Sequence, residues 1–179
     1  MGCLGECPPS NFEESFIYTS CFSGNGKVKL MNNTYKNVKD LTKGDKLENG
    51  AIVECLIIKK INAILQVVEL NGVYYSLKHP IMYNGNWVYP KSVKRPKEVF
   101  IDYFYNLVLS NGYSAKINDI ETISLGHCQE GGVAYHPYYG TEKVIQALKK
   151  YNQYNDGKIL IEKKLTVKRD ENGRTISYF

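Results

Sequence analysis

A series of turn signals constrains the fold of this chain more than any other feature of its sequence. From Val28 to about Leu125, apolar runs rich in β-branched and aromatic residues alternate with short Gly- and Asn-containing turns. Asn-Gly between two such runs favours the type I′ turn, which joins antiparallel strands into a hairpin. Several hairpins in succession predict a compact, mainly β domain. The turn signals are Gly50, Asn71-Gly72, Asn84-Gly85, Asn111-Gly112 and Asn118-Asp119.

Length and composition agree with one principal domain. A chain of 179 residues can bury a core of its own, so oligomerisation is not required and we expect a monomer. The 15 tyrosines and the runs of Val, Ile and Thr favour strands over helices. The sequence has neither a signal peptide nor an apolar window long enough to cross a membrane, which predicts a soluble chain. Its cellular location stays open.

The five cysteines do not form a recognisable framework. They are odd in number and lack paired C-x-x-C spacing, so the sequence predicts neither a disulfide scaffold nor a metal site, and no cofactor is indicated. At least one thiol is free. The cysteines are Cys3, Cys7, Cys21, Cys55 and Cys128.

The two ends of the chain differ from the middle. Residues 1–20 are polar, contain Pro8-Pro9 and show no periodicity, which is typical of a linker or flanking segment. Beyond Gly131-Gly132, the stretch 141–150 begins with a capping Thr and predicts a helix, and 158–168 predicts one or two strands. We therefore expect a flank at 1–20, a domain at 21–128 and an appended region at 129–179. Trp87, close to a turn signal, is expected in the core.

Cys21 opens the most suggestive stretch, Cys-Phe-Ser-Gly-Asn-Gly-Lys-Val-Lys-Leu at 21–30. A cysteine that leads a Gly-punctuated turn and an alternating strand can attack the carbonyl before it, which here belongs to Ser20. That attack turns the Ser20–Cys21 amide into a thioester. An isolated cysteine would more often be a small buried hydrophobe, but these neighbours favour a nucleophile.

The stretch 21–47 resembles the opening block of the Hedgehog/intein, or Hint, family of self-processing domains. A second block is similar to the family's Thr-x-x-His: Ser76-Leu-Lys-His79-Pro80, directly after an apolar strand. Ser76 supplies the hydroxyl and His79 the imidazole. The chemistry needs both, because an amide nitrogen leaves only when protonated and a histidine can deliver that proton.

The runs 99–109 and 117–128 resemble the closing strands of the fold, which in inteins end on His-Asn. His127 matches the histidine. Asn106 stands where many inteins carry Asp, and an amide cannot act as acid or base. Cys128 replaces the terminal asparagine whose cyclisation releases the C-terminal flank. Because the chain also continues for 51 residues, the resemblance implies cleavage at the N-terminal junction without ligation.

Among Hint families the sequence is most similar to the Vint type, which is found with von Willebrand factor A domains. The likeness rests on Leu125-Gly126-His127 and on the stretch 134–145. It implies a horseshoe of curved β-hairpins with pseudo-two-fold symmetry, and an adduct-recognition-like region at 129–179. It also implies that the domain acts on its own N-terminal flank, with a von Willebrand A-type domain upstream. His136 lies outside the family's core blocks and is expected to be structural or to contact a ligand.

The sequence thus predicts an autocatalytic domain in which Cys21, Ser76, His79 and His127 form and orient a thioester at Ser20. Water, a thiol or a bound alcohol would resolve it. Asn106 and Cys128 are expected to modulate the reaction. The resemblance implies that Cys128 lies near Cys21, where it is expected simply to pack; a Cys21–Cys128 disulfide that switches the nucleophile off is the alternative hypothesis.

An alternative is a weakly active or inactive scaffold that binds a polyanion, such as a sulfated glycosaminoglycan, through its basic C-terminal region. Residues 129–179 carry nine basic and six acidic residues, and the binding could also gate cleavage. We expect no nucleic-acid partner. The candidate binding residues are Lys149, Lys150, Lys163, Lys164, Lys168 and Arg169.

Overall fold

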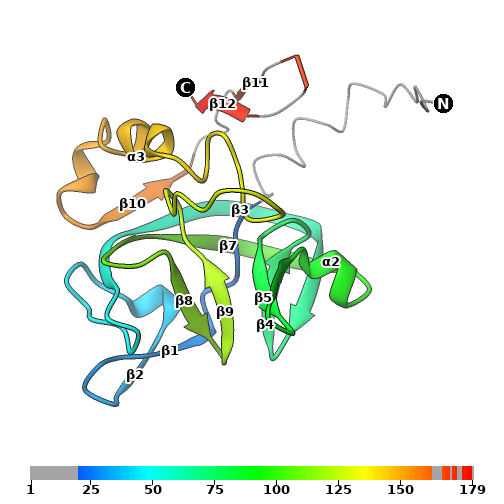
Figure 1. The fold of residues 1–179 in the computed structure, drawn as a ribbon, viewed down its shortest axis with the longest axis horizontal. Coiled ribbons are helices and arrows are strands. Elements are labelled where there is room, and N and C mark those ends of the chain that lie inside the picture. The colour runs from blue at the N-terminus through cyan, green and yellow to red at the C-terminus, as the bar shows by residue number, and fades with distance from the viewer. Residues whose placement is uncertain (1–19, 163–166, 170, 173–174, 179) are drawn as a thin grey trace.

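A computed structural model describes residues 20–162, 167–169, 171–172 and 175–178. The chain is mainly β, as the sequence predicts, with short helical elements between strands (Figure 1). The strands are β1 (Lys27–Lys29), β2 (Tyr35–Asn37), β3 (Ile52–Leu70), β4 (Val73–Ser76), β5 (Ile81–Tyr83), β6 (Asn86–Val88), β7 (Lys97–Ser110), β8 (Ser114–Ile117), β9 (Ile120–Ile123), β10 (Lys158–Ile161), β11 (Val167–Arg169) and β12 (Thr175–Tyr178). The helical elements are η1 (Val38–Asp40), α2 (Pro90–Val93), α3 (Glu142–Leu148) and η2 (Asn152–Tyr154).

Two long antiparallel strands, β3 and β7, cross the whole molecule (Figure 1). Their pairing runs from Ile52↔Ser110 to Val67↔Lys97, with two register shifts on the way. Such irregularities increase the local twist and bend of a strand, which allows so long a ribbon to curve. β4 pairs with Val67–Leu70 at the C-terminal end of β3, and β10 pairs with Leu56–Lys59 near its N-terminal end.

The predicted turns lie where the sequence places them. Asn71-Gly72 joins β3 to β4, Asn84-Gly85 joins β5 to β6, and Asn118-Asp119 joins β8 to β9. In all three, both residues have positive φ, between 44° and 79°, as a type I′ turn requires. At Asn111-Gly112 only the asparagine has a positive φ. Glycine is required at position 112 for a different reason: a Cβ there would lie 2.8 Å from the Ala51 Cβ, which is too close.

The segment that begins at Cys21 is inserted between β4 and β7. The Phe22 amide donates to the Tyr105 carbonyl at 3.1 Å, and the Tyr105 amide donates back at 2.8 Å. On the other side, the Ser23 amide donates to the Tyr74 carbonyl at 2.8 Å. Backbone hydrogen bonds on both sides therefore fix the position of the Ser20–Cys21 peptide.

The predicted C-terminal helix is confirmed as α3. The Thr141 hydroxyl accepts a hydrogen bond from the Lys143 amide, which caps the helix, and Val144, Ile145 and Leu148 are buried. The region predicted to form strands contains β10 and β11. In β10, Ile159 is buried and Leu160 is 40% exposed, which is the alternation expected of a strand covered on one face.

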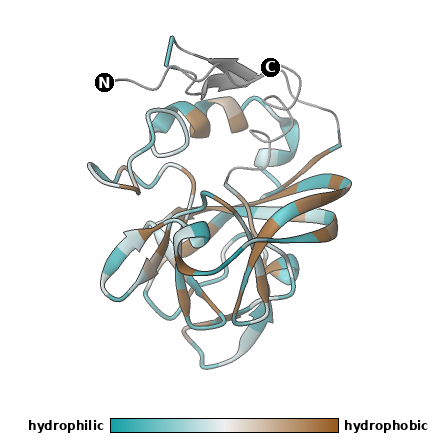
Figure 2. Cartoon of the chain, turned by 90° about the vertical axis from the view of Figure 1, so that its right-hand side faces the viewer, coloured by the Kyte–Doolittle hydropathy of each residue, from teal (hydrophilic) through white to brown (hydrophobic). Residues whose placement is uncertain are grey.

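Two large hydrophobic clusters share the β3–β7 ribbon. One contains Phe22, Leu56, Tyr75 and Leu107, and the other joins Ile57 to α3 and β10. Residues 134–161 are thus packed on the same ribbon as the strands before them. Hydrophobic residues are concentrated along the strands (Figure 2). Trp87 lies in β6 but is only partly buried, so the prediction of a core position was wrong.

Among the described residues, no helix combines the length and apolar character needed to cross a bilayer.

Candidate active site

The Ser20–Cys21 peptide is held by a side chain on each of its polar atoms. The Asn106 amide Nδ2 donates a hydrogen bond to the Ser20 carbonyl oxygen. The Cys21 amide N–H donates to the Ser76 Oγ at 3.0 Å. Because the Asn106 Oδ1 accepts from the Leu107 amide at 2.8 Å, its Nδ2 is kept facing Ser20. The peptide is therefore clamped from β7 on its oxygen side and from β4 on its nitrogen side.

A tight turn after β4 positions Ser76 and His79 together. The Ser76 amide donates to the Cys21 carbonyl at 2.9 Å, and the His79 amide donates to the Ser76 carbonyl at 3.3 Å. These bonds tie the backbone of the turn directly to the Cys21 residue. The sequence-predicted pair of a hydroxyl and an imidazole thus lies beside the peptide, as expected.

The hydrogen-bond partners of the His79 ring indicate which of its two nitrogens carries the proton. Nε2 lies 2.8 Å from the Ile123 carbonyl oxygen, which can only accept, so Nε2 carries a proton. Nδ1 then has the free lone pair of a neutral ring, and it lies 3.4 Å from the Ser20 Oγ. The ring packs edge-on against Phe22, with centroids 5.1 Å apart.

Burial lowers the pKa of His79 to about 4. Hydrogen bonds to the backbones of Ile123 and Ser20 favour the charged ring, while the nearby His127 and Lys59 oppose it. The ring is therefore neutral near pH 7, with one nitrogen able to accept a proton.

The thiol of Cys21 is fully buried against Val67, Ile101 and Phe104. Burial raises its pKa, and the Lys59 side chain, hydrogen-bonded to it, acts in the opposite direction. Sequence reasoning did not single out Lys59. A signal existed, because Lys59 lies two and four residues after the apolar Ile57 and Cys55 and so shares their inward face.

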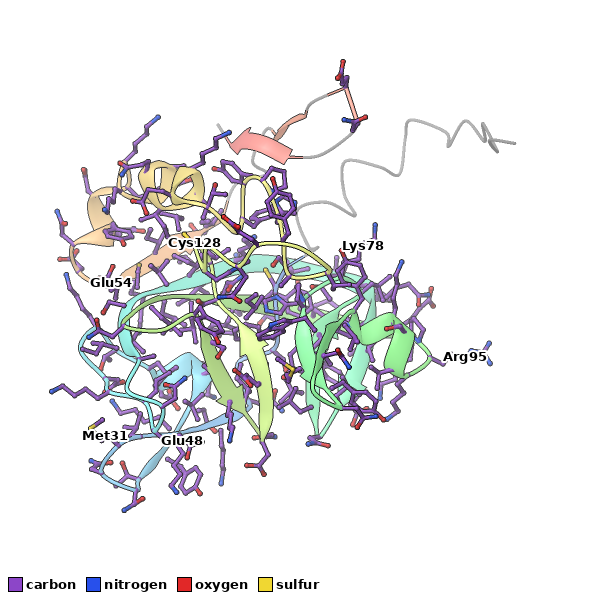
Figure 3. All side chains as sticks on the ribbon, in the orientation of Figure 1. Met31, Glu48, Glu54, Lys78, Arg95 and Cys128 are labelled. Carbon is purple, nitrogen blue, oxygen red and sulfur yellow. The ribbon has the colours of Figure 1, made fainter. Side chains whose placement is uncertain are left out.

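His127 lies at the same cavity as Ser20. The cavity, of about 320 Å³, is lined among others by Ser20, Lys78, His127 and His136. The Nδ1 of His127 accepts a hydrogen bond from the Gln129 amide at 2.9 Å, and burial lowers its pKa to about 4. Lys78 points outward from the loop after β4 (Figure 3). His127 therefore shares this cavity with Ser20, the residue on the acyl side of the peptide.

Cys128 lies on the loop that leads from β9 to α3 (Figure 3) and is exposed. Its backbone has a φ of 54°, and its amide donates to the Gly140 carbonyl. Cys21 and Cys128 are both free thiols in this structure, one buried and one exposed, so the hypothesised disulfide between them is not formed here.

His136 has the structural role expected of it. Its Nδ1 accepts hydrogen bonds from the amides of Tyr138 and Tyr139, at 3.1 and 3.0 Å, and so fixes the loop before α3.

The structure tests the predicted polyanion-binding residues only in part, because some of them lie outside the residues that it describes. Lys149 lies 3.8 Å from Glu142, and Lys150 is exposed. Lys168 and Arg169 belong to β11, whereas Lys163 and Lys164 fall outside the described residues. Polyanion binding thus stays a prediction. Within the described residues, no cluster of three or more His, Cys, Asp or Glu side chains has the arrangement of a metal site.

Comparison with known proteins adds one match. The family model described as Vint, a Hint-domain, matches residues 20–177. No curated protein matches the chain. The match begins at the residue whose carbonyl the Asn106 side chain holds, and it extends through α3 and β10 to β12.

Proposed function

Because this chain belongs to the Vint family of Hint domains, which are self-processing domains in general, we propose that it cleaves its own N-terminal junction through a thioester at Cys21. The observation that carries the proposal is the clamp on the Ser20–Cys21 peptide: Asn106 on its oxygen and Ser76 on its nitrogen. Both partners are side chains rather than backbone groups, so each can stay in contact with its atom of the peptide while the bond between Ser20 and Cys21 changes.

In the first step the Cys21 sulfur attacks the Ser20 carbonyl carbon. Negative charge develops on the carbonyl oxygen, where the Asn106 N–H already donates. A preorganised donor at this position lowers the barrier, and removing one costs typically about 10²–10³ in rate. Asn106 therefore serves as an oxyanion donor, a role that needs no acid or base chemistry.

In the second step the C–N bond breaks and the Cys21 nitrogen leaves as an amine. The proton that it needs is the one lost by the thiol, and His79 transfers it. Nδ1 can accept this proton because Nε2 already donates to Ile123, and the low pKa of the ring makes it a strong donor once charged. Ser76 keeps the nitrogen oriented meanwhile.

The thioester is then resolved from the cavity that contains Ser20 and His127. Water, a thiol or an alcohol that enters this cavity reaches the acyl carbon and releases the flank before Cys21. A buried, neutral imidazole such as that of His127 is suited to take the proton from such a nucleophile. Cys128 has no side-chain amide and cannot cyclise, so ligation of the two flanks does not follow.

The proposal is tested by the intact mass of the full chain after incubation with dithiothreitol or hydroxylamine. We expect a fragment that begins at Cys21, together with the released flank, and neither in Cys21→Ala. The exposed thiol provides the matched control, since Cys128→Ala should cleave like the wild type. An unchanged mass with both nucleophiles would reject self-cleavage and favour the scaffold that binds a polyanion.

A further inference from the structure

A lysine is buried in the centre of the molecule. Lys59 lies in β3 and is only 8% exposed. Its neighbours in the sheet are apolar: Phe104 on β7 and Ile161 on β10. Burying an ammonium group among apolar side chains costs free energy unless hydrogen bonds or an opposite charge compensate, so the burial of Lys59 needs an explanation.

The side chain of Lys59 reaches the nucleophile. A hydrogen bond joins it to the Cys21 thiol, which is itself fully buried. Within the described part of the chain, Tyr139 and Tyr151, before and after α3, also favour the charged form of Lys59, and His79 is close enough for Lys59 to lower its pKa. The two tyrosines are phenols of ordinarily high pKa. Of these groups, the Cys21 thiolate is the anion that Lys59 contacts through a hydrogen bond.

The surroundings of Lys59 strengthen this interaction. It lines a mainly apolar cavity of about 290 Å³, together with Ile57, Leu125, Leu148 and Tyr151. Charges attract one another more strongly where apolar side chains exclude much of the water. Burial alone would keep Cys21 as an unreactive thiol, because a bare thiolate there is unfavourable.

We propose that Lys59 is a catalytic residue, the counter-ion that stabilises the Cys21 thiolate through a hydrogen bond to Sγ while the sulfur attacks Ser20. The proposal rests on the self-cleavage proposed above. It assigns to β3 a third contribution to the reaction, beside those of β4 and β7.

The step balances without any added reagent. The S–H bond of Cys21 breaks and the S–C bond to Ser20 forms, while the C–N bond breaks and an N–H bond forms on the Cys21 amine. The thiol proton is the proton that His79 delivers. Lys59 keeps all of its protons, and its ammonium is paired with the thiolate only until the thioester neutralises the sulfur.

Burial opposes the charged form of Lys59, but the Cys21 thiolate and the two tyrosines together raise its pKa. Lys59 and Cys21 therefore favour each other's charged forms. Replacing Lys59 with an uncharged, apolar side chain should leave the burial of Cys21 and remove the two largest effects that favour the thiolate, the charge of Lys59 and its hydrogen bond.

The test measures the thiolate directly. In the full chain carrying His79→Gln, which keeps the peptide uncleaved, the ultraviolet absorbance of the thiolate is followed against pH and the signal of a matching Cys21→Ser protein is subtracted. We expect Lys59→Met to raise the midpoint of the Cys21 titration by about one pH unit or more, a change of at least about tenfold in the ionisation constant. In the chain with His79 restored, thioester formation near pH 7 should slow by a similar factor.

The matched control is Lys60→Met, because Lys60 is the next residue of β3 and is exposed. Its midpoint should equal that of the parent protein. If Lys59→Met does not fold by circular dichroism, Lys59→Gln keeps a hydrogen-bond donor without the charge and should give a smaller shift in the same direction. An unchanged midpoint in a folded Lys59 variant would overturn the pairing. A shifted midpoint in a chain that never cleaves would retain the pairing and reject the proposed function instead.

Discussion

Asn106 illustrates how much the role of a side chain depends on the atom that it faces. An amide is neither an acid nor a base, and from the sequence alone its presence weakens the expected chemistry. In the structure its Nδ2 faces the Ser20 carbonyl oxygen, and its Oδ1 is occupied by the Leu107 amide. A donor is what a developing oxyanion requires, so in the proposed reaction Asn106 can assist without acting as an acid or a base.

We expect Asn106→Ala to slow thioester formation by about 10²–10³, the typical loss for one oxyanion donor. The rate can be measured as the appearance of the cleaved mass in excess hydroxylamine. Asn86→Ala is the control, since Asn86 is exposed in β6 and should leave the rate unchanged. Equal rates in the two variants would exclude Asn106 from the reaction.

The sequence predicted four residues that the structure brings to one place: Cys21, Ser76 and His79 around the peptide, and His127 across the cavity from Ser20. It could do so because the first three belong to two short, recognisable blocks. Lys59 belongs to neither block, and only the pairing of β3 with its neighbours brings it to Cys21.

Among the elements, β10 determines how the C-terminal region is attached. It pairs parallel to β3, with Ile159 opposite Ile57, and Ile159 is completely buried. α3 covers the same cluster, through Val144 and Leu148. This region is therefore part of the hydrophobic core around β3, and it forms one wall of the cavity beside Lys59.

Ile159→Ala should lower the free energy of unfolding by about 2–5 kcal/mol, as expected when a buried isoleucine leaves a cavity. The neighbouring Leu160 is 40% exposed, and Leu160→Ala should change it by less than about 0.5 kcal/mol. Denaturant unfolding of both variants checks the difference. Similar small losses in both would mean that β10 is not held by its buried face.

The positions of the turns and the mainly β class could be predicted from the sequence, because Asn-Gly has a local physical preference for one turn type. The length of β3, from Ile52 to Leu70, could not be predicted. The strand contains the polar stretch Lys59-Lys60 and Asn62, which locally favours a break. The register of its pairing with β7 shifts there and Asn62 has a φ of 50°, but the pairing continues beyond this irregularity to Val67. The partial exposure of Trp87 likewise depends on what packs over β6.

The molecule as a whole has two buried histidines whose ionisation opposes folding. Burial lowers the pKa of both His79 and His127 to about 4, against about 6.5 in an unfolded chain. The unfolded state therefore binds more protons between these values. Stability is complete above about pH 6.5 and is lost as the pH falls toward 4.

His79, which is completely buried, can account for about 3 kcal/mol of this loss, at 1.36 kcal/mol per pH unit. His127 lines a cavity and should contribute less, because solvent there screens its charge. We expect the free energy of unfolding to fall steeply between about pH 6.5 and 4, and His79→Gln to make that dependence shallower. Urea unfolding at several pH values measures both. A free energy that stays constant over this range in the wild type would contradict the prediction.

The clamp on the Ser20–Cys21 peptide joins residues 86 positions apart in the sequence. During synthesis the ribosome completes Cys21 early, β4 later and β7 later still, while His127 follows last of all. The nucleophile is thus made long before the groups that activate it. Cleavage would then report that the domain has finished folding, and a chain that stalls or misfolds would keep its N-terminal flank attached.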